Sequence, residues 1–297
     1  MKKSDAKVSI FGRGIAAKSS SAASSKSSSG IFVFLYNDQN CYDSEHTLTV
    51  QEFGKTFSVE ELCYMAVEKL KMTPLVAPLF ALAHQGSVES CLPPNEKILC
   101  SDDCAHKFVL RVRFVPPESV ISKLPHIDHE MFNYLFQQIR SDFINDYIVY
   151  RDKTIGQEYL LGLAVIDMVR YGKQHCISLA DLRNVEPQTF IPASAKNKFS
   201  NIFDKVRLQI NFKPHLEEEY KKYEKDTVVN TQLTYIKSVS EYAEHYGMET
   251  FRIVNDFSSS SETAFVQVKP YDSKFPGLNI YRGKVCIALL TCCRAYH

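Results

Sequence analysis

The stretch LLGLAVIDMVRYGKQH, Leu160 to His175, restricts the fold more than any other part of the sequence. It begins as an apolar run, but Asp167 interrupts the run, and Arg170 and Lys173 follow it. The uninterrupted apolar part is shorter than the roughly 18 to 20 residues that a membrane-crossing helix needs. A helix that is apolar on most sides at first and amphipathic at its end is typical of the centre of a bundle. We therefore predict a buried helix whose C-terminal end lies at the surface.

Length and composition favour more than one folded unit. With 297 residues, 45% of them hydrophobic, the chain can bury one large core or two to three small ones, because domains usually contain about 100 to 200 residues. The net charge of +1 provides no overall attraction to nucleic acid, which is therefore not an expected partner. The nine cysteines are scattered and no signal-peptide core follows Met1, which predicts free thiols in the cytosol. Residues 1–30 are rich in serine and are expected to be a disordered leader.

Residues 31–116 show the order of a β-grasp domain. IFVFLY and HTLTV are strand-like and are separated by turn-forming residues, which predicts a hairpin. SVEELCYMAVEKLKM follows, in which Ser58 and Glu61 fit a capping box and apolar residues recur at helical spacing. PLFALAHQ (Pro78 to Gln85) and KFVLRVRFVP (Lys107 to Pro116) supply two further strands. Two strands, one helix and two further strands predict a ubiquitin-like lobe.

Residues 125–247 are predicted to form a helical lobe. Asp128 is placed to begin the helix HEMFNYLFQQIRSDFINDYI, since its side chain can bind the unpaired backbone donors of the first turn. Apolar residues recur in this helix at four-residue steps: Met131, Leu135, Ile139 and Phe143. Residues 248–297 contain aromatic and β-branched runs with turn residues between them, which predicts strands of a third unit.

The patterns for catalysis or metal binding are incomplete. Cys100, Cys104 and His106 could offer three ligands to zinc, but no second ligand pair lies nearby, which favours a loop with ordinary thiols. His126 and His129 lack the four-residue spacing of a helical zinc motif. The kinase signatures HRDxxxxN, DFG and APE are missing from the sequence. We therefore expect no catalytic residues, no metal and no cofactor in this chain.

The order of a β-grasp unit, a helical unit and a strand-rich unit resembles a FERM module, and several strings are similar to the Janus kinase family. SVEELCYMAVEKLKMTPLVAPLFALA resembles the first lobe of that family, and FNYLFQQIRSDFIND and LGLAVIDMVR resemble its second lobe. TFIPASAKNKF (Thr189 to Phe199) is similar to the segment that opens a long helix, and YIKSVSEYAEHYGMETFRI to the helix before the third lobe. The resemblance covers residues 31 to about 280 and implies an α+β fold. Its lobes would be ubiquitin-like (31–116), acyl-CoA-binding-protein-like (125–247) and pleckstrin-homology-like (248–297).

The resemblance implies binding without catalysis. In Janus kinases the FERM module holds the membrane-proximal tail of a cytokine receptor, an extended, proline-containing segment that meets a hydrophobic groove and basic side chains of the second lobe. The candidate binding residues here are Lys196, Lys198, Lys205, Arg207 and Lys213. Such a module would lie in the cytoplasm at the inner face of the plasma membrane, with the anionic membrane surface as a further candidate partner. Focal adhesion kinases and band 4.1 or ezrin-like proteins share the architecture, so a cytoskeletal or phosphoinositide-binding adaptor is the alternative.

Two features depart from the family pattern. Pro214 should end or kink the family's long helix, because it lacks a backbone N–H and clashes with the preceding turn. The acidic run LEEEYKKYEK occupies a part of that helix that is usually rich in lysine and arginine, which would weaken the receptor-facing charge or move it toward Lys221, Lys222 and Lys225. Such a charge run is otherwise typical of a solvated helix face. The residues after Gly247 are too few for a complete third lobe, so we expect an incomplete lobe without the SH2-like and kinase domains. Cys292 and Cys293 in its tail are candidates for palmitoylation.

Overall fold

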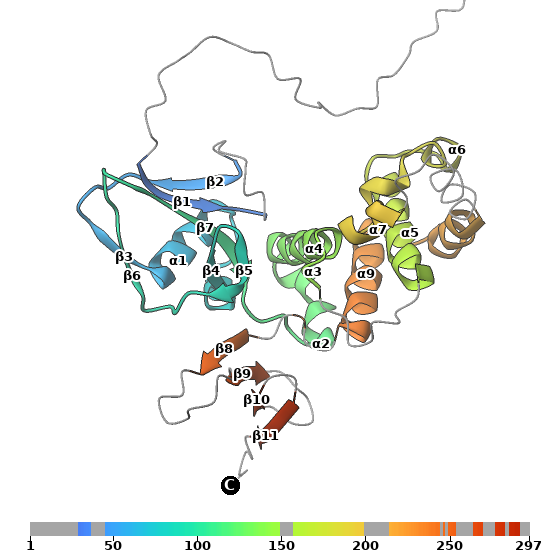
Figure 1. The fold of residues 1–297 in the computed structure, drawn as a ribbon. Coiled ribbons are helices and arrows are strands. Elements are labelled where there is room, and N and C mark those ends of the chain that lie inside the picture. Colours follow the sequence, from blue (N-terminus) through green and yellow to red (C-terminus); the bar gives the residue numbers. More distant parts are fainter. Residues whose placement is uncertain are drawn as a thin grey trace, which may run out of the picture.

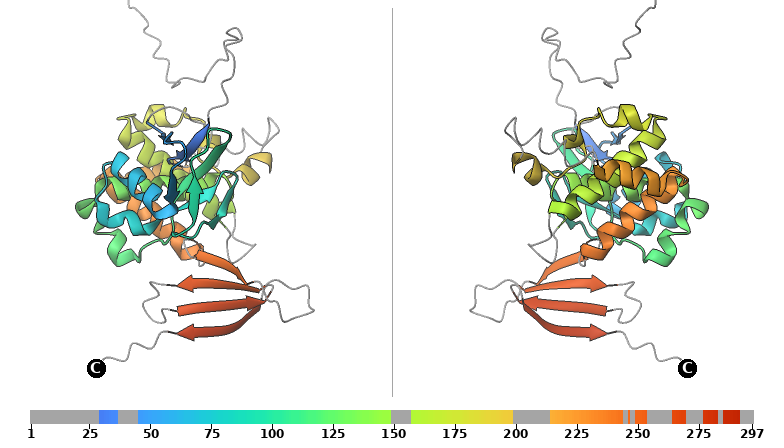
Figure 2. Two further views of the ribbon diagram at one scale, coloured as in Figure 1. Left: turned by 90° about the vertical axis from the view of Figure 1, so that its left-hand side faces the viewer. Right: turned by 90° about the vertical axis from the view of Figure 1, so that its right-hand side faces the viewer.

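The computed structural model describes residues 29–36, 45–148, 157–198, 214–243, 246, 249–253, 264–269, 277–282 and 285–291. Along the chain, a strand-rich lobe with one long helix is followed by a helical lobe and then by a four-stranded sheet (Figure 1). The four-stranded sheet lies to one side of the first two lobes, as two further views show (Figure 2). The expected leader lies outside the described residues except for Ser29 and Gly30.

The first lobe is built on a mixed sheet with the strand order β2-β1-β7-β4-β5, in which β1 and β7 are parallel and the other neighbours are antiparallel. A separate pair, β3 and β6, is antiparallel. The strands are β1 (Gly30–Phe34), β2 (Thr47–Val50), β3 (Thr56–Ser58), β4 (Phe80–His84), β5 (Ser87–Cys91), β6 (Lys97–Leu99) and β7 (Ala105–Val112). The helices are α1 (Val59–Lys69) and the 3-10 helix η1 (Pro74–Leu79).

Helix α1 begins where the sequence predicts. The side chain of Ser58 accepts a hydrogen bond from the backbone N of Glu61, and the Glu61 carboxylate accepts one from the backbone N of Ser58, so the capping box is confirmed. One face of α1 is buried in the core of the lobe: Val59, Leu62, Cys63, Ala66 and Val67. The helix contacts β4 and β2, which places it across the sheet as a β-grasp fold requires.

The predicted strands of the first lobe are confirmed, with differences at their ends. The strand expected from Pro78 begins at Phe80, because Pro78 and Leu79 belong to η1. The sequence did not predict the short strands β3, β5 and β6. All residues of β7 from Phe108 to Val112 are buried, including Arg111, so side chains on both faces of this strand are covered.

The helical lobe follows at once and surrounds one long buried helix. Its elements are α2 (Glu118–Ile121), α3 (Leu124–Ile127), α4 (His129–Ile144), α5 (Gln157–Gln174), α6 (Leu179–Leu182), η2 (Pro187–Thr189), α7 (Ala193–Lys198), a helix over residues 214–223, and α9 (Val228–Tyr242). Residues 163–170 of α5 are each at most 8% exposed, and α5 packs against α9. The prediction of a buried central helix is therefore confirmed. The N-cap role of Asp128 is also confirmed, since its side chain accepts a hydrogen bond from Met131 N.

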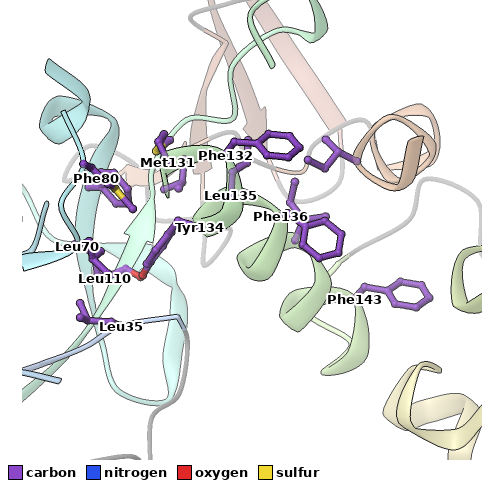
Figure 3. Packing of buried hydrophobic residues seen from close by; sticks show 14 of the residues in the cluster. Leu35, Leu70, Phe80, Leu110, Met131, Phe132, Tyr134, Leu135, Phe136 and Phe143 are labelled. Atoms are coloured by element: carbon purple, nitrogen blue, oxygen red, sulfur yellow. The ribbon is translucent and has the colours of Figure 1, made fainter. Parts of the chain in front are cut away.

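The two lobes share one core. Buried residues from β1, α1 and β4 belong to the same apolar cluster as the buried face of α4, and Figure 3 shows Phe80 and Leu110 of the first lobe beside Met131 and Tyr134 of α4. The four predicted apolar positions of α4 are all buried: Met131, Leu135, Ile139 and Phe143. Because the core is continuous, α4 holds a fixed place against β7.

The third unit is an antiparallel sheet in the order β11-β10-β9-β8. Its strands are β8 (Glu249–Ile253), β9 (Ala264–Lys269), β10 (Gly277–Arg282) and β11 (Val285–Thr291), close to the runs that the sequence predicts as strands. Strand β8 lies against β5 of the first lobe. Cys292 and Cys293 lie outside the described residues.

Candidate peptide-binding surface of the helical lobe

Helix α7 carries Lys196 and Lys198, the first two of the binding residues that the sequence predicts. The carboxylate of Asp146, just after α4, accepts two hydrogen bonds of 2.6 Å, from the backbone N and from the side-chain Oγ of Ser194. This carboxylate satisfies a backbone donor that the first turn of α7 leaves unpaired. The start of α7 is therefore fixed to the end of α4, although the two residues are far apart in sequence.

The residues before α7 fasten the same segment to the core. Phe190 and Ile191 are 2% and 1% exposed. The ring of Phe190 packs edge-on against Tyr171 of α5, with ring centres 5.6 Å apart, and the guanidinium of Arg140 lies 5.8 Å from the Phe190 ring centre. The turn that leads into α7 thus rests on both α4 and α5.

The buried carboxylate of Asp167 joins the two helices beneath this segment. It accepts hydrogen bonds from Nε of Arg140 in α4, at 2.5 Å, and from Nε of Arg170 in α5, at 2.7 Å. Asp167 and Arg170 are at most 5% exposed, so both charges are compensated inside the lobe. The charged residues in the apolar stretch therefore hold α4 and α5 together.

The predicted binding residues are only partly within the described structure. Lys196 and Lys198 lie in α7, whose backbone is described, whereas Lys205, Arg207 and Lys213 lie outside the described residues. The structure thus places the backbone of the first two on an anchored helix. It does not test their role or that of the other three.

The acidic run after Pro214 carries ion pairs that compensate much of its charge. Glu217 pairs with Arg183 at 2.8 Å, and Glu219 pairs with Lys222 at 3.6 Å. Lys222 is therefore not an isolated cation available to a partner, while Lys221 and Lys225 are exposed. This arrangement agrees with the interpretation of the run as a solvated helix face.

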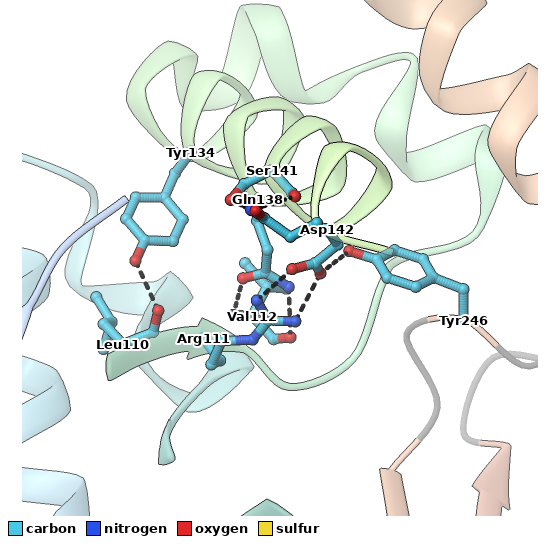
Figure 4. A network of polar contacts seen from close by, with 9 residues as sticks. Leu110, Arg111, Val112, Tyr134, Gln138, Ser141, Asp142 and Tyr246 are labelled. Carbon is cyan, nitrogen blue, oxygen red and sulfur yellow. Dashed lines mark hydrogen bonds and ion pairs between the residues drawn. The ribbon is translucent and has the colours of Figure 1, made fainter. Parts of the chain in front are cut away.

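A buried ion pair joins the first lobe to α4. Both terminal nitrogens of Arg111 in β7 donate to the carboxylate of Asp142, at 2.8 and 2.6 Å, and the two side chains are 9% and 1% exposed (Figure 4). The hydroxyl of Tyr246, which follows α9, donates to the same carboxylate at 2.6 Å. We call these three residues the clasp. Sequence reasoning missed all of them.

Two further polar side chains of α4 bind the backbone of β7. Gln138 accepts from Val112 N at 2.7 Å and donates to Val112 O at 3.3 Å, and Tyr134 donates from its hydroxyl to Leu110 O at 2.7 Å. These bonds satisfy buried backbone groups beyond Val109, where the pairing of β7 with β1 ends. They fix the position of α4 along β7, with Tyr134 at Leu110 and Gln138 at Val112.

Burial and pairing shift the pKa values of the groups at this junction. Burial opposes the charge on Arg111, but the hydrogen bonds and charge of Asp142 outweigh it, so the pKa of Arg111 lies above its ordinary value. Burial raises the pKa of the Tyr134 hydroxyl, and burial together with the Asp142 charge raises that of Tyr246. Both tyrosines therefore keep their protons and act as hydrogen-bond donors.

The three candidate zinc ligands do not have a common environment. Cys100 is buried and its Sγ lies 3.5 Å from the carbonyl O of Val50, whereas Cys104 is exposed with its Sγ 3.4 Å from Nε2 of His106. Within the described residues, no three histidine, cysteine, aspartate or glutamate side chains gather as a metal site.

The same described residues include no helix with the length and apolar character to cross a membrane.

The two lobes match known domains over most of their length. Residues 31–118 match the FERM F1 ubiquitin-like domain, and residues 124–244 match the FERM F2 acyl-CoA binding protein-like domain. The chain therefore belongs to the FERM family.

Among curated proteins, the chain is similar to the tyrosine-protein kinase JAK1 of Danio rerio, with 22% identity in an alignment 273 residues long; the alignment covers 79% of this chain. The aligned part is 24% of the kinase, so the chain spans about a quarter of that relative.

Solved structures show the same fold. The MyTH4-FERM MF2 domain of myosin VII from Dictyostelium discoideum matches with a TM-score of 0.59 and 13% identity, over 89% of this chain and 50% of that one. A mutant of the same domain matches with a TM-score of 0.56 and 13% identity, over 89% of this chain and 52% of the other. The chain therefore spans about half the length of these structures.

Proposed function

We propose that this chain is a non-catalytic module that binds the membrane-proximal cytoplasmic tail of a cytokine receptor, at the inner face of the plasma membrane. The observation that carries the proposal is the similarity to JAK1 over 79% of this chain, together with the match of both lobes to FERM domains. The strings that resemble Janus kinases include the segment Thr189 to Phe199, and its helix α7 is anchored to the bundle through Asp146 and Ser194.

An anchored helix suits the capture of an extended peptide. A rigid surface loses little conformational freedom on binding, so more of the contact energy contributes to affinity. The peptide would place apolar side chains on the bundle and acidic ones near Lys196 and Lys198, with further charge from Lys205, Arg207 and Lys213. Charge pairs at the rim of such a site contribute mainly to the association rate and to specificity.

The test measures the binding of a labelled, proline-containing receptor tail peptide by fluorescence anisotropy. The variant Lys196→Glu/Lys198→Glu reverses two charges on α7, and Lys69→Glu/Lys71→Glu reverses two exposed charges on the first lobe as the matched control. We expect the α7 variant to weaken binding roughly tenfold, and more at low salt, while the control stays near wild type. Equal affinities for the two variants, or no peptide binding at all, would overturn the proposal.

The alternative, a phosphoinositide-binding or cytoskeletal adaptor, is supported by the shared FERM architecture alone. Co-sedimentation with vesicles that contain phosphatidylinositol bisphosphate separates the two functions. Vesicle binding without any peptide binding would favour the adaptor, whereas peptide binding that survives without vesicles supports the receptor module.

A further inference from the structure

The last turn of α4 is held at both ends by contacts from other parts of the chain. Asp142 belongs to the clasp, and Asp146, four residues later, holds the start of α7. We propose that Tyr246 stabilises the start of α7 through this turn, so that the connection to the third unit controls how firmly the candidate binding helix is held. The binding role of α7 rests on the proposed function, but the coupling does not.

The clasp brings three parts of the chain to one carboxylate. Arg111 comes from β7 of the first lobe and Asp142 from α4, while Tyr246 lies between the end of α9 at Tyr242 and the start of β8 at Glu249. The connection between the helical lobe and the third unit is thus tied to α4 by a hydrogen bond of 2.6 Å (Figure 4). A displacement of this connection would remove one donor from Asp142.

The backbone of the turn links the two aspartates directly. Tyr147 N donates to the carbonyl O of Asp142 at 2.9 Å, and Asp146 N donates to Phe143 O at 3.3 Å. These two bonds form a Schellman motif, in which the residue after the C-cap takes a left-handed conformation. Asp146 has φ 60°, which glycine adopts far more readily than aspartate. Tertiary contacts therefore help to keep Asp146 in this conformation, and Ser194 supplies two of them.

The mechanism is a shared local stability. While Tyr246 and Arg111 hold the side chain of Asp142, the carbonyl of Asp142 stays in place to bind Tyr147 N, and Asp146 stays aimed at Ser194. Loss of the Tyr246 hydroxyl weakens the hold on the turn, so the turn opens more often and releases α7. A hydrogen bond to a buried carboxylate is strong enough to change such opening by about tenfold.

Hydrogen exchange on the whole chain, read by mass spectrometry without any peptide, tests this coupling. Tyr246→Phe removes the hydroxyl from the clasp. Tyr159→Phe is the matched control, because it removes an equally short hydrogen bond, 2.6 Å to Ser238 O, between α5 and α9 of the same lobe. We expect Tyr246→Phe to raise exchange in residues 193–198 about tenfold, and Tyr159→Phe to leave it within about twofold.

A second variant checks that the turn holds α7 through the carboxylate of Asp146. Asp146→Gly keeps the left-handed backbone but removes the carboxylate, so it should release residues 193–198 and leave exchange in β7 unchanged. Faster exchange that stays confined to residues around 246, or an equal rise in both tyrosine variants, would overturn the proposal. If residues 193–198 respond as expected but no receptor peptide binds, the coupling stands and the proposed function fails.

Discussion

Replacing Asp142 by asparagine tests whether the clasp is the main polar tie between the lobes. The asparagine side chain would keep the shape and one acceptor oxygen, but it would remove the negative charge that the buried Arg111 binds and turn an amide group toward one of the former donors. Breaking a buried ion pair in this way costs about 3 to 5 kcal/mol. That is a large part of the roughly 5 to 15 kcal/mol that stabilises most domains.

The assay is thermal and urea unfolding followed by far-UV circular dichroism, since the chain contains no tryptophan. For a chain of 297 residues, with an unfolding entropy of about 2.1 cal/mol/K per residue, the expected loss corresponds to a fall in Tm of about 5 to 8 °C. Glu52→Gln is the matched control: the same change of carboxylate to amide in the ion pair with Lys55, where both side chains are more than half exposed. This control should cost less than about 1 kcal/mol.

A second pair of substitutions separates charge from packing. Arg111→Met with Asp142→Leu replaces both charges by apolar groups, which is often neutral or stabilising for a buried pair, so it should recover most of the lost stability. A loss of less than about 1 kcal/mol for Asp142→Asn would refute the reasoning, because it would mean that solvent reaches the pair.

Three other predictions concern single sites. Ser58→Ala removes the N-cap of α1 and should lower the unfolding free energy by about 1 kcal/mol, measured by urea denaturation. Gly162→Ala should raise the unfolding free energy by about 0.5 to 1 kcal/mol, since a Cβ at this position would meet none of the described atoms within 4 Å. Gly172→Ala should lose this gain, because the new Cβ would lie 2.9 Å from a side-chain carbon of Leu182. Burial raises the pKa of Cys63 to about 12, so alkylation at pH 8 followed by mass spectrometry should modify the exposed Cys104 long before Cys63; similar rates would contradict the burial.

The sequence predicted most of the fold because its local patterns agree with the tertiary structure. The capping box at Ser58, the N-cap at Asp128 and the four-residue steps in α4 each involve neighbours in sequence, and each is confirmed. The short strands β3, β5 and β6 were missed because three to five residues of mixed polarity carry no clear alternation. Tertiary pairing, such as that of β3 with β6, forms them.

The clasp could not be predicted from local patterns, because its partners are 31 and 104 residues apart. One signal was present: Gln138 and Asp142 fall on the same helical stripe as Leu135 and Ile139, and polar residues on a buried stripe need a partner. The sequence does not identify that partner. Asp146 and Ser194 gave no comparable signal, since both are exposed residues of ordinary turn and helix-start composition.

The most direct test of the account is to map where a receptor tail peptide lies on the intact chain. A proline-containing peptide with a photoreactive residue is cross-linked to the chain, and the attachment sites are read by mass spectrometry. We predict attachment on residues 189–213 and on the end of α4 beside Asp146. Attachment only on the first lobe or on the third sheet would contradict the claim that the helical lobe receives the peptide.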